Sequence, residues 1–238
     1  MNELLVNIRE DAVWPTGFVM RPREQRVDAD LVEAYRTIPT AHISDCLGRH
    51  QGGIGLKDFH GAVRNGGLCG TAITVRARPG DNVMIHAAIL IAQPGDVIVV
   101  DGAGDVSTAL LGGLMRTTAL SRQIGGFVVD GAIRDVTEWA EGDMPIYAKG
   151  YTHRGPSKDG PGELNVPVAC AGLAVLPGDL VVGDADGVVV VPADQARALL
   201  KKCRALAARE DSVRAQNRSG QPDQARFIQI LKNKGCPL

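Results

Sequence analysis

The chain has 238 residues and a formal net charge of −1, with 26 lysines and arginines against 27 acidic residues. This balance leaves no electrostatic footprint for nucleic acid, and no stretch approaches the roughly 20 apolar residues that a membrane span requires. We therefore expect neither a nucleic-acid nor a membrane partner. Aromatic residues make up only 4%, so the core must consist of Val, Ile, Leu and Ala.

Five cysteines lie far apart, and none of them forms a Cys-x-x-Cys pair. An odd number at such spacing argues against a disulfide framework or a zinc site and favours free thiols in a reducing compartment. The chain is accordingly predicted to be cytoplasmic. The cysteines are Cys46, Cys69, Cys170, Cys203 and Cys236.

Three segments differ in character along the chain. Residues 1–27 are mixed and contain two prolines, which suggests an arm lying on the surface or on a neighbouring subunit. Residues 28–218 carry the periodic patterns and are predicted to form a single domain that includes a long C-terminal helix. Residues 219–238 read as a polar tail.

Within the domain, apolar periodicity and turn residues predict alternating helices and strands. Helices are expected at 28–38, 40–49, 83–92, 136–143 and 194–218, with Asp28 or Asp30 as a cap of the first and Thr40 or Ser44 as a cap of the second. Strands are expected at 70–77, 97–100, 145–148 and, as a hairpin, 180–184 with 187–192. Residues 149–165 form a Gly/Pro-rich loop that is long enough to be functional.

The sequence Pro-Gly-Asp opens a strand twice, at 94–96 and at 177–179. Two copies are too few for a repeat protein. They do suggest two similarly built sheet edges, and hence an α/β fold with a mixed β-sandwich or barrel flanked by helices.

The stretch Gly95–Asp135 reads as strand, Gly-rich turn, helix, Gly-rich turn and strand. Each strand is expected to end on an acid followed by glycine, at Asp101 and Asp130. Buried parallel strands gather polar residues at their carboxyl ends, where open α/β sheets bind ligands. A nucleotide loop is disfavoured, because the glycine pair at 102 and 104 lacks the third glycine of the dinucleotide motif.

Arg134 and Asp135 are adjacent on the loop that ends this stretch. A guanidinium can hold a substrate carboxylate or keto oxygen in fork geometry, and a carboxylate can bind a hard divalent cation. The alternative is that the pair only closes a turn or makes an intersubunit salt bridge.

Gly112 and Gly113 open the helix within the same stretch. Free N–H groups at a helix start favour anions, so the amides of Leu114 and Met115 are candidates to hold a carboxylate opposite Arg134. A plain glycine-rich helix entry is the alternative.

Three blocks carry a resemblance to a known family. They are GDNVMIHAAILIAQPGDVIVVDG at 80–102, GGLMRTTALSRQIGGFVVDGAIRD at 112–135 and PGDLVVGDADGVVVVP at 177–192. In order and spacing they resemble the family that unites regulator of ribonuclease activity A with the metal-dependent 4-hydroxy-4-methyl-2-oxoglutarate/4-carboxy-4-hydroxy-2-oxoadipate aldolases. The resemblance runs from about Thr40 to Arg214.

The resemblance implies a fold like the phosphohistidine swivelling domain and a homotrimer or dimer of trimers with active sites between subunits. It implies that Arg134 binds a small 2-oxo acid and stabilises the pyruvate enolate, and that Asp135 is a Mg²⁺ or Mn²⁺ ligand. Gly112, Gly113, Leu114 and Met115 correspond to the segment whose amides hold the pyruvyl carboxylate. Glu210 corresponds to a metal-approaching carboxylate from the neighbouring subunit.

The chain departs from the aldolase pattern at Gly113, where the aldolases carry an acid that holds metal-bound waters. Asp101 or Asp105 are the candidates to compensate. The sequence therefore predicts a divalent-metal-dependent lyase that cleaves or decarboxylates a 2-oxo acid. The alternatives are a non-catalytic regulator of ribonuclease activity that binds a protein partner, and a lyase of the same fold for a different oxo acid.

Overall fold

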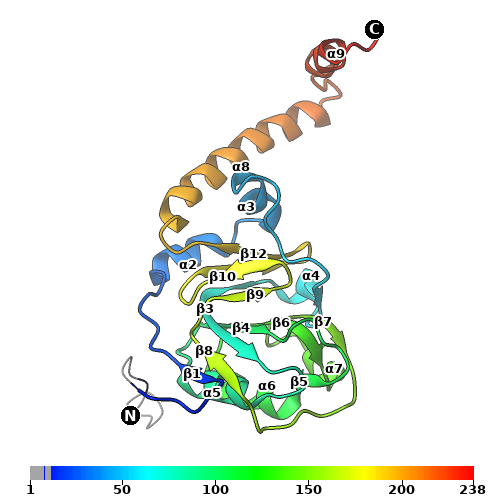
Figure 1. Ribbon diagram of the computed structural model, residues 1–238. Helices are drawn as coiled ribbons and strands as arrows, with labels where there is room; N and C mark the ends of the chain where they lie inside the picture. Colours follow the sequence, from blue (N-terminus) through cyan, green and yellow to red (C-terminus); the bar gives the residue numbers. More distant parts are fainter. Residues whose placement is uncertain (1–7, 9–11) are drawn as a thin grey trace.

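Four parallel strands form the middle of a ten-stranded mixed sheet, in the order β3-β4-β6-β7 (Figure 1). They belong to a computed structural model that describes residue 8 and residues 12–238. The strands are β1 (Phe18–Met20), β2 (Lys57–Asp58), β3 (Leu68–Ala77), β4 (Val97–Asp101), β5 (Ala109–Leu111), β6 (Gly126–Ile133), β7 (Ile146–Tyr151), β8 (Gly162–Leu164), β9 (Val168–Cys170), β10 (Leu173–Val175), β11 (Leu180–Asp184) and β12 (Gly187–Val191). The helices are α2 (Ala29–Tyr35), α3 (Thr40–Cys46), α4 (Ala62–Asn65), α5 (Val83–Ile91), α6 (Gly113–Ser121), α7 (Val136–Trp139), α8 (Ala196–Arg218) and α9 (Gln224–Asn233).

The strands alternate their side chains between two apolar layers. Ile98 and Val100 of β4 join a core beneath α5, α6 and α7, whereas Val97 and Val99 face a second core under β9, β10, β11 and β12. Successive side chains of a strand point to opposite faces, so a continuous apolar run such as Val97–Val100 is the expected sequence of a strand buried on both sides. This confirms the prediction of buried parallel strands.

A third apolar layer lies on the outer face of the β11–β12 hairpin. There α2, α3 and α8 pack against Val182, Val189 and Val191. Figure 1 shows the resulting order of layers, with α5 and α6 at one end of the molecule, α2 and α3 at the other, and α8 extending away from the body. The α/β class and a mixed sheet flanked by helices are therefore confirmed.

Most predicted elements are found, with differences at their ends. The hairpin at Leu180–Asp184 and Gly187–Val191 and the long helix Ala196–Arg218 are confirmed. The expectation that the third parallel strand ends at Asp130 is wrong, because β6 continues to Ile133 and pairs there with both β5 and β7. The acid is instead buried inside the strand, where it pairs with Lys149 at 2.7 Å.

Neither early helix is capped as predicted. Asp28 occupies the cap position of α2 without a side-chain cap bond, and its carboxylate instead accepts from Arg197. The cap of α3 comes from another element, since Asp184 accepts from both the N–H and the hydroxyl of Thr40, at 2.8 and 2.7 Å.

Segments outside the predicted elements also take part in structure. Phe18–Met20 pairs in parallel with Gly162–Leu164, so the N-terminal segment and the long loop 149–165 each contribute a strand to the main sheet. The C-terminal segment contains the helix Gln224–Asn233. Among the described residues, no helix combines the length and the apolar character needed to cross a bilayer.

Asp81 ties the long loop to the start of α5. Its buried carboxylate accepts from the Ser157 hydroxyl at 2.6 Å and from the N–H groups of Val83, Asp159 and Gly160 at 2.7–3.0 Å. Burial opposes its ionisation, but these hydrogen bonds outweigh burial and lower the pKa of the Asp81 carboxyl below its usual 3.8.

Asp81→Asn is expected to lower the free energy of unfolding by about 2 kcal/mol at pH 7, because hydrogen bonds to a charged acceptor are replaced by neutral ones. Because the folded pKa is lowered, the carboxylate stabilises the fold above pH 3.8, and this contribution disappears as the pH falls through the folded pKa. Urea unfolding of both proteins between pH 7 and pH 3 measures the difference. A difference that stays constant down to pH 3 would contradict this assignment.

Candidate active site at the start of α6

Two turns at the carboxyl edge of the parallel strands lie side by side. The chain leaving β5 turns at Gly112 into α6, and the chain leaving β6 turns at Asp135 into α7. Parallel pairing of β5 with β6 and a 2.8 Å hydrogen bond from the Arg134 N–H to the Leu111 carbonyl hold these turns together. The structure therefore brings the predicted Arg134–Asp135 pair against the predicted helix start.

Asp135 caps α6 from outside the helix. Gly112, at the cap position, has no side chain to bond the exposed amides, and Asp135 Oδ2 accepts from the Gly113 N–H at 2.8 Å. The Asp135 backbone is left-handed, with φ +59°, a conformation that Asp adopts more readily than most residues. An ionised carboxylate has about four acceptor positions, so one cap bond leaves capacity for a cation.

Arg134 lies beside this carboxylate. Its Nε atom is 3.6 Å from Asp135 Oδ2, and about 40% of each side chain is exposed. A methyl group at Gly155 would lie 2.8 Å from Arg134 Nη1, so the long loop passes directly over the guanidinium. The guanidinium is thus placed between a carboxylate and a loop, with access to solvent.

The side chains of Arg134 and Asp135 lie so close to the backbone at position 112 that only glycine fits there. A Cβ atom there would lie 2.6 Å from Asp135 Oδ2 and 2.9 Å from Arg134 Nε, well inside contact distance. Contact with these two side chains therefore explains the glycine at position 112, and the sequence pattern did not predict this contact.

Glu138 is a candidate residue that the sequence interpretation missed. A Cβ atom built on Gly113 would lie 2.2 and 2.4 Å from its two carboxylate oxygens. The Glu138 carboxylate thus fills the space that a side chain at position 113 would occupy. The spacing Asp135-x-x-Glu138 at a helix start was the available signal, because residues three apart share a helix face.

The two predicted amides differ in availability. The Met115 N–H donates to the Gly112 carbonyl at 3.0 Å, whereas helix geometry leaves the Leu114 N–H without an intrahelical acceptor. The Leu114 side chain is 84% exposed beside this turn. Of the two, the Leu114 N–H is the better placed to receive an anion.

The three other carboxylates predicted from the sequence, those of Glu210, Asp101 and Asp105, do not contribute to this site within one chain. Glu210 lies on α8, where Oε2 is 3.0 Å from His42 Nε2 and 2.9 Å from Arg214 Nη2. Figure 1 places α8 at the opposite end of the molecule from α6. Asp101 and Asp105 accept hydrogen bonds from Ala103 and Ser107 in their own loop.

The donor set decides which metal the site could hold. Among residue 8 and residues 12–238, no three His, Cys, Asp or Glu side chains are grouped to enclose a metal ion. Asp135 and Glu138, on either side of Gly113, offer two carboxylates and no nitrogen or sulfur. Mg²⁺ is usually held by one or two carboxylates together with waters and substrate, so an all-oxygen pair of this kind suits a hard divalent cation better than zinc.

Comparisons with known proteins agree with this architecture. Residues 40–190 match the RraA-like family model, described as Aldolase/RraA. A putative 4-hydroxy-4-methyl-2-oxoglutarate aldolase from Halalkalibacterium halodurans is 40% identical over 183 residues, covering 75% of this chain and 84% of the relative. A 4-hydroxy-4-methyl-2-oxoglutarate aldolase from Thermus thermophilus is 35% identical over 137 residues, 58% of this chain and 81% of the relative.

A solved structure shares the fold. The RNA-processing inhibitor RraA from Thermus thermophilus superposes with a TM-score of 0.58 and 33% identity, covering 65% of this chain and 92% of that one. The family match spans more than half of the chain, and its relatives include proteins named as aldolases and a protein named as an inhibitor. The chain is a member of the RraA-like family of aldolases and RraA proteins.

Proposed function

We propose that this protein is a divalent-metal-dependent lyase that cleaves or decarboxylates a small 2-oxo acid. The observation that carries the proposal is the position of Gly113, whose N–H binds Asp135 and whose Cα faces the Glu138 carboxylate. Two carboxylates and a guanidinium thus meet at a helix start, at the sheet edge where α/β proteins bind ligands. The aldolase names of the relatives support the same reaction class.

Asp135 and Glu138 are the residues that would hold Mg²⁺ or Mn²⁺. When bound there, the cation acts as a Lewis acid that polarises the 2-oxo group of the substrate. Because Asp135 also caps α6, binding of the cation is coupled to the position of the helix start.

The remaining groups bind and orient the substrate. The Leu114 N–H and the positive end of α6 attract the carboxylate next to the oxo group. Arg134 donates to the oxo oxygen and stabilises the negative charge that it gains as the enolate forms. The long loop passes over Arg134 at Gly155 and so bounds one side of the space beside the guanidinium.

The same proposal includes the assembly. A swivelling-domain-like trimer or dimer of trimers would bring Glu210 of a neighbouring subunit to Asp135, which α8 cannot do within its own chain. His42 and Arg214, which bind Glu210 here, would then share it or release it.

A regulator of ribonuclease activity is the second candidate. It is supported by the likeness to a solved RNA-processing inhibitor. In that case Arg134, Asp135 and Glu138 would be dispensable for function. Binding to an endoribonuclease assembly would depend on the outer surface of the protein.

Release of pyruvate from 4-hydroxy-4-methyl-2-oxoglutarate and from oxaloacetate, followed with lactate dehydrogenase and Mg²⁺, distinguishes the two. The lyase proposal predicts turnover that oxalate, an analogue of the enolate, inhibits competitively. Absence of turnover on either substrate, combined with specific retention of an endoribonuclease, would support the regulator.

Glu138→Ala is expected to lower kcat/KM about 10- to 100-fold, the usual cost of losing a carboxylate that supports a bound metal. Adding Gly113→Asp to this variant should restore part of the loss, because the new side chain enters the space that Glu138 vacates. Gly113→Asp alone should not raise activity, since two carboxylates would meet there. Steady-state kinetics of the three variants test this, and full activity of Glu138→Ala would contradict the role of Glu138.

A further inference from the structure

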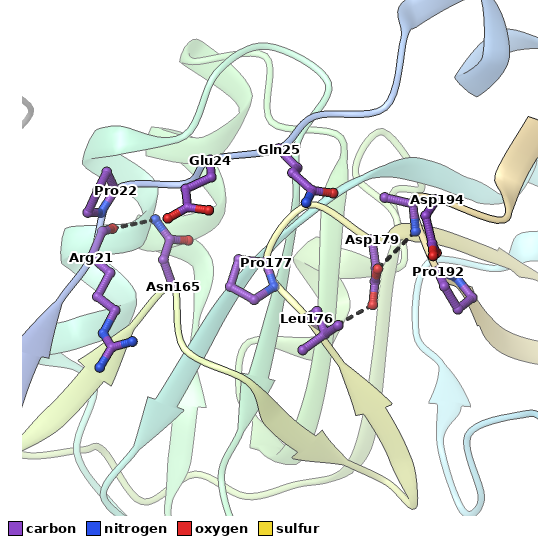
Figure 2. A pocket seen from close by; sticks show the side chains of 11 residues that line it. Arg21, Pro22, Glu24, Gln25, Asn165, Leu176, Pro177, Asp179, Pro192 and Asp194 are labelled. Atoms are coloured by element: carbon purple, nitrogen blue, oxygen red, sulfur yellow. Dashed lines mark hydrogen bonds between the residues drawn. The ribbon is translucent and has the colours of Figure 1, made fainter. Parts of the chain in front are cut away.

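A pocket of about 550 Å³ opens at the other edge of the sheet (Figure 2). The Asp179 carbonyl in its wall accepts from the N–H of Ala72, which pairs with Val97 at the start of β4. The pocket therefore lies at the amino ends of the parallel strands, whereas the candidate active site lies at their carboxyl ends. Its volume is within the range of small-molecule sites.

A buried polar atom in this pocket has no partner in the part of the chain that the structure describes. Asn165 is 5% exposed, and its Nδ2 donates to the Arg21 carbonyl at 2.9 Å, which fixes the orientation of the amide. The Oδ1 atom has no hydrogen-bond partner among residue 8 and residues 12–238, and Figure 2 shows it directed into the pocket, away from the Arg21 carbonyl. Buried acceptors are normally satisfied, so Asn165 Oδ1 marks a position for a hydrogen-bond donor.

The charged residues in the lining of this pocket are mostly acidic. Glu24, Asp179 and Asp194 line the pocket, and Arg21 is the basic residue in its lining. In Figure 2 the Arg21 guanidinium points away from the side on which Asp179 and Asp194 lie. The donor that satisfies Asn165 would therefore enter a field of negative charge.

Asp179 is a buried acid in the wall of this pocket. Its carboxylate accepts from the Leu176 and Ala193 N–H groups at 2.9 and 3.0 Å. Burial, and then the neighbouring Asp194, nevertheless raise the pKa of the Asp179 carboxyl, despite the two hydrogen bonds.

We propose that this pocket binds a small organic cation with N–H donors, a guanidinium or a primary ammonium, through Asn165 Oδ1 and the carboxylates of Glu24, Asp179 and Asp194. An organic cation can place one N–H on Asn165 and keep its charge near the acids. The site is separate from the candidate active site, so it does not depend on the lyase proposal.

The probe is n-butylguanidinium, and its neutral analogue n-butylurea has nearly the same shape, with a carbonyl oxygen in place of one NH₂ group. Isothermal titration calorimetry should show saturable 1:1 binding of the cation with a Kd on the order of 1 mM, as expected for so few atoms. The urea should bind at least about tenfold more weakly, since the positive charge and two of the five N–H donors are lost while three N–H donors remain for Asn165. Equal binding of the two, or no saturable binding of the cation, would overturn the proposal.

Three variants locate the site. Asp194→Asn should weaken binding about fivefold, whereas Asp186→Asn, an exposed acid in the β11–β12 turn outside the pocket, should leave it unchanged. Asn165→Gly removes the amide without straining the backbone, which has φ +53° there, and should weaken binding about tenfold. If Asn165→Gly does not fold, comparison of the two aspartate variants still tests the location of the site. Equal effects of Asp194→Asn and Asp186→Asn on binding would contradict this location.

Discussion

Asp135→Asn is expected to lower kcat/KM for a 2-oxo acid about 100- to 1000-fold while leaving the fold intact. Asparagine also adopts a left-handed backbone, and its amide oxygen can still accept from the Gly113 N–H, so the helix cap is retained. What is lost is the negative charge that would hold the cation, and with it the Lewis acid that stabilises charge in the transition state. Steady-state pyruvate release and thermal unfolding measure the two effects separately.

Glu141→Gln is the matched control for this variant. Glu141 follows α7 closely in the sequence, but its carboxylate binds Arg116 at 2.8 Å and takes no part in the turn at Gly113. Its replacement should change kcat/KM less than about twofold, because Glu141 itself is exposed and the buried Arg116 keeps its second partner, Asp143. Equal losses in the two variants would show that the effect comes from general disturbance of this region.

Arg134→Lys is expected to lower kcat/KM about 100-fold. Lysine keeps the positive charge but not the planar fork that can bind an oxo oxygen and a neighbouring carboxylate together. Because the lost contacts strengthen as the enolate forms, most of the decrease should appear in kcat. Kinetics with oxaloacetate and inhibition by oxalate measure the change in turnover and in affinity for an enolate analogue.

An unchanged kcat in Arg134→Lys would contradict a catalytic role of the guanidinium and leave Arg134 with a structural role only. Its main-chain groups already have such a role, since its N–H binds Leu111 and its carbonyl accepts from the Trp139 indole. These main-chain bonds survive the substitution, so the variant isolates the guanidinium.

The long elements of this fold follow from local sequence. The strand Val97–Asp101 has the continuous apolar run of a strand that is buried on both faces, and the hairpin Leu180–Val191 has an acidic, glycine-containing turn between two valine runs. The three-residue strands β1, β5 and β8 could not be predicted in this way. Three residues are too few to show the alternation of apolar and polar residues that marks a strand. Their extended conformation depends on pairing with distant strands.

The candidate site was predictable to a similar extent. Their place at a strand end makes Arg134 and Asp135 candidates from the sequence alone. The contact between Glu138 and Gly113 depends on the angle at which α7 leaves β6, which no local pattern contains. The same limit applies to the caps, since the carboxylate that caps α3 comes from Asp184, 144 residues further along the chain.

The most direct test of the account is the metal dependence of turnover in chelator-treated protein. We expect pyruvate release from 4-hydroxy-4-methyl-2-oxoglutarate or oxaloacetate to fall to background without a divalent cation and to return with Mg²⁺ or Mn²⁺. In Asp135→Asn the same additions should restore little. Full turnover in excess chelator, or equal restoration in the variant and the native protein, would contradict a metal-dependent site at Asp135 and Glu138.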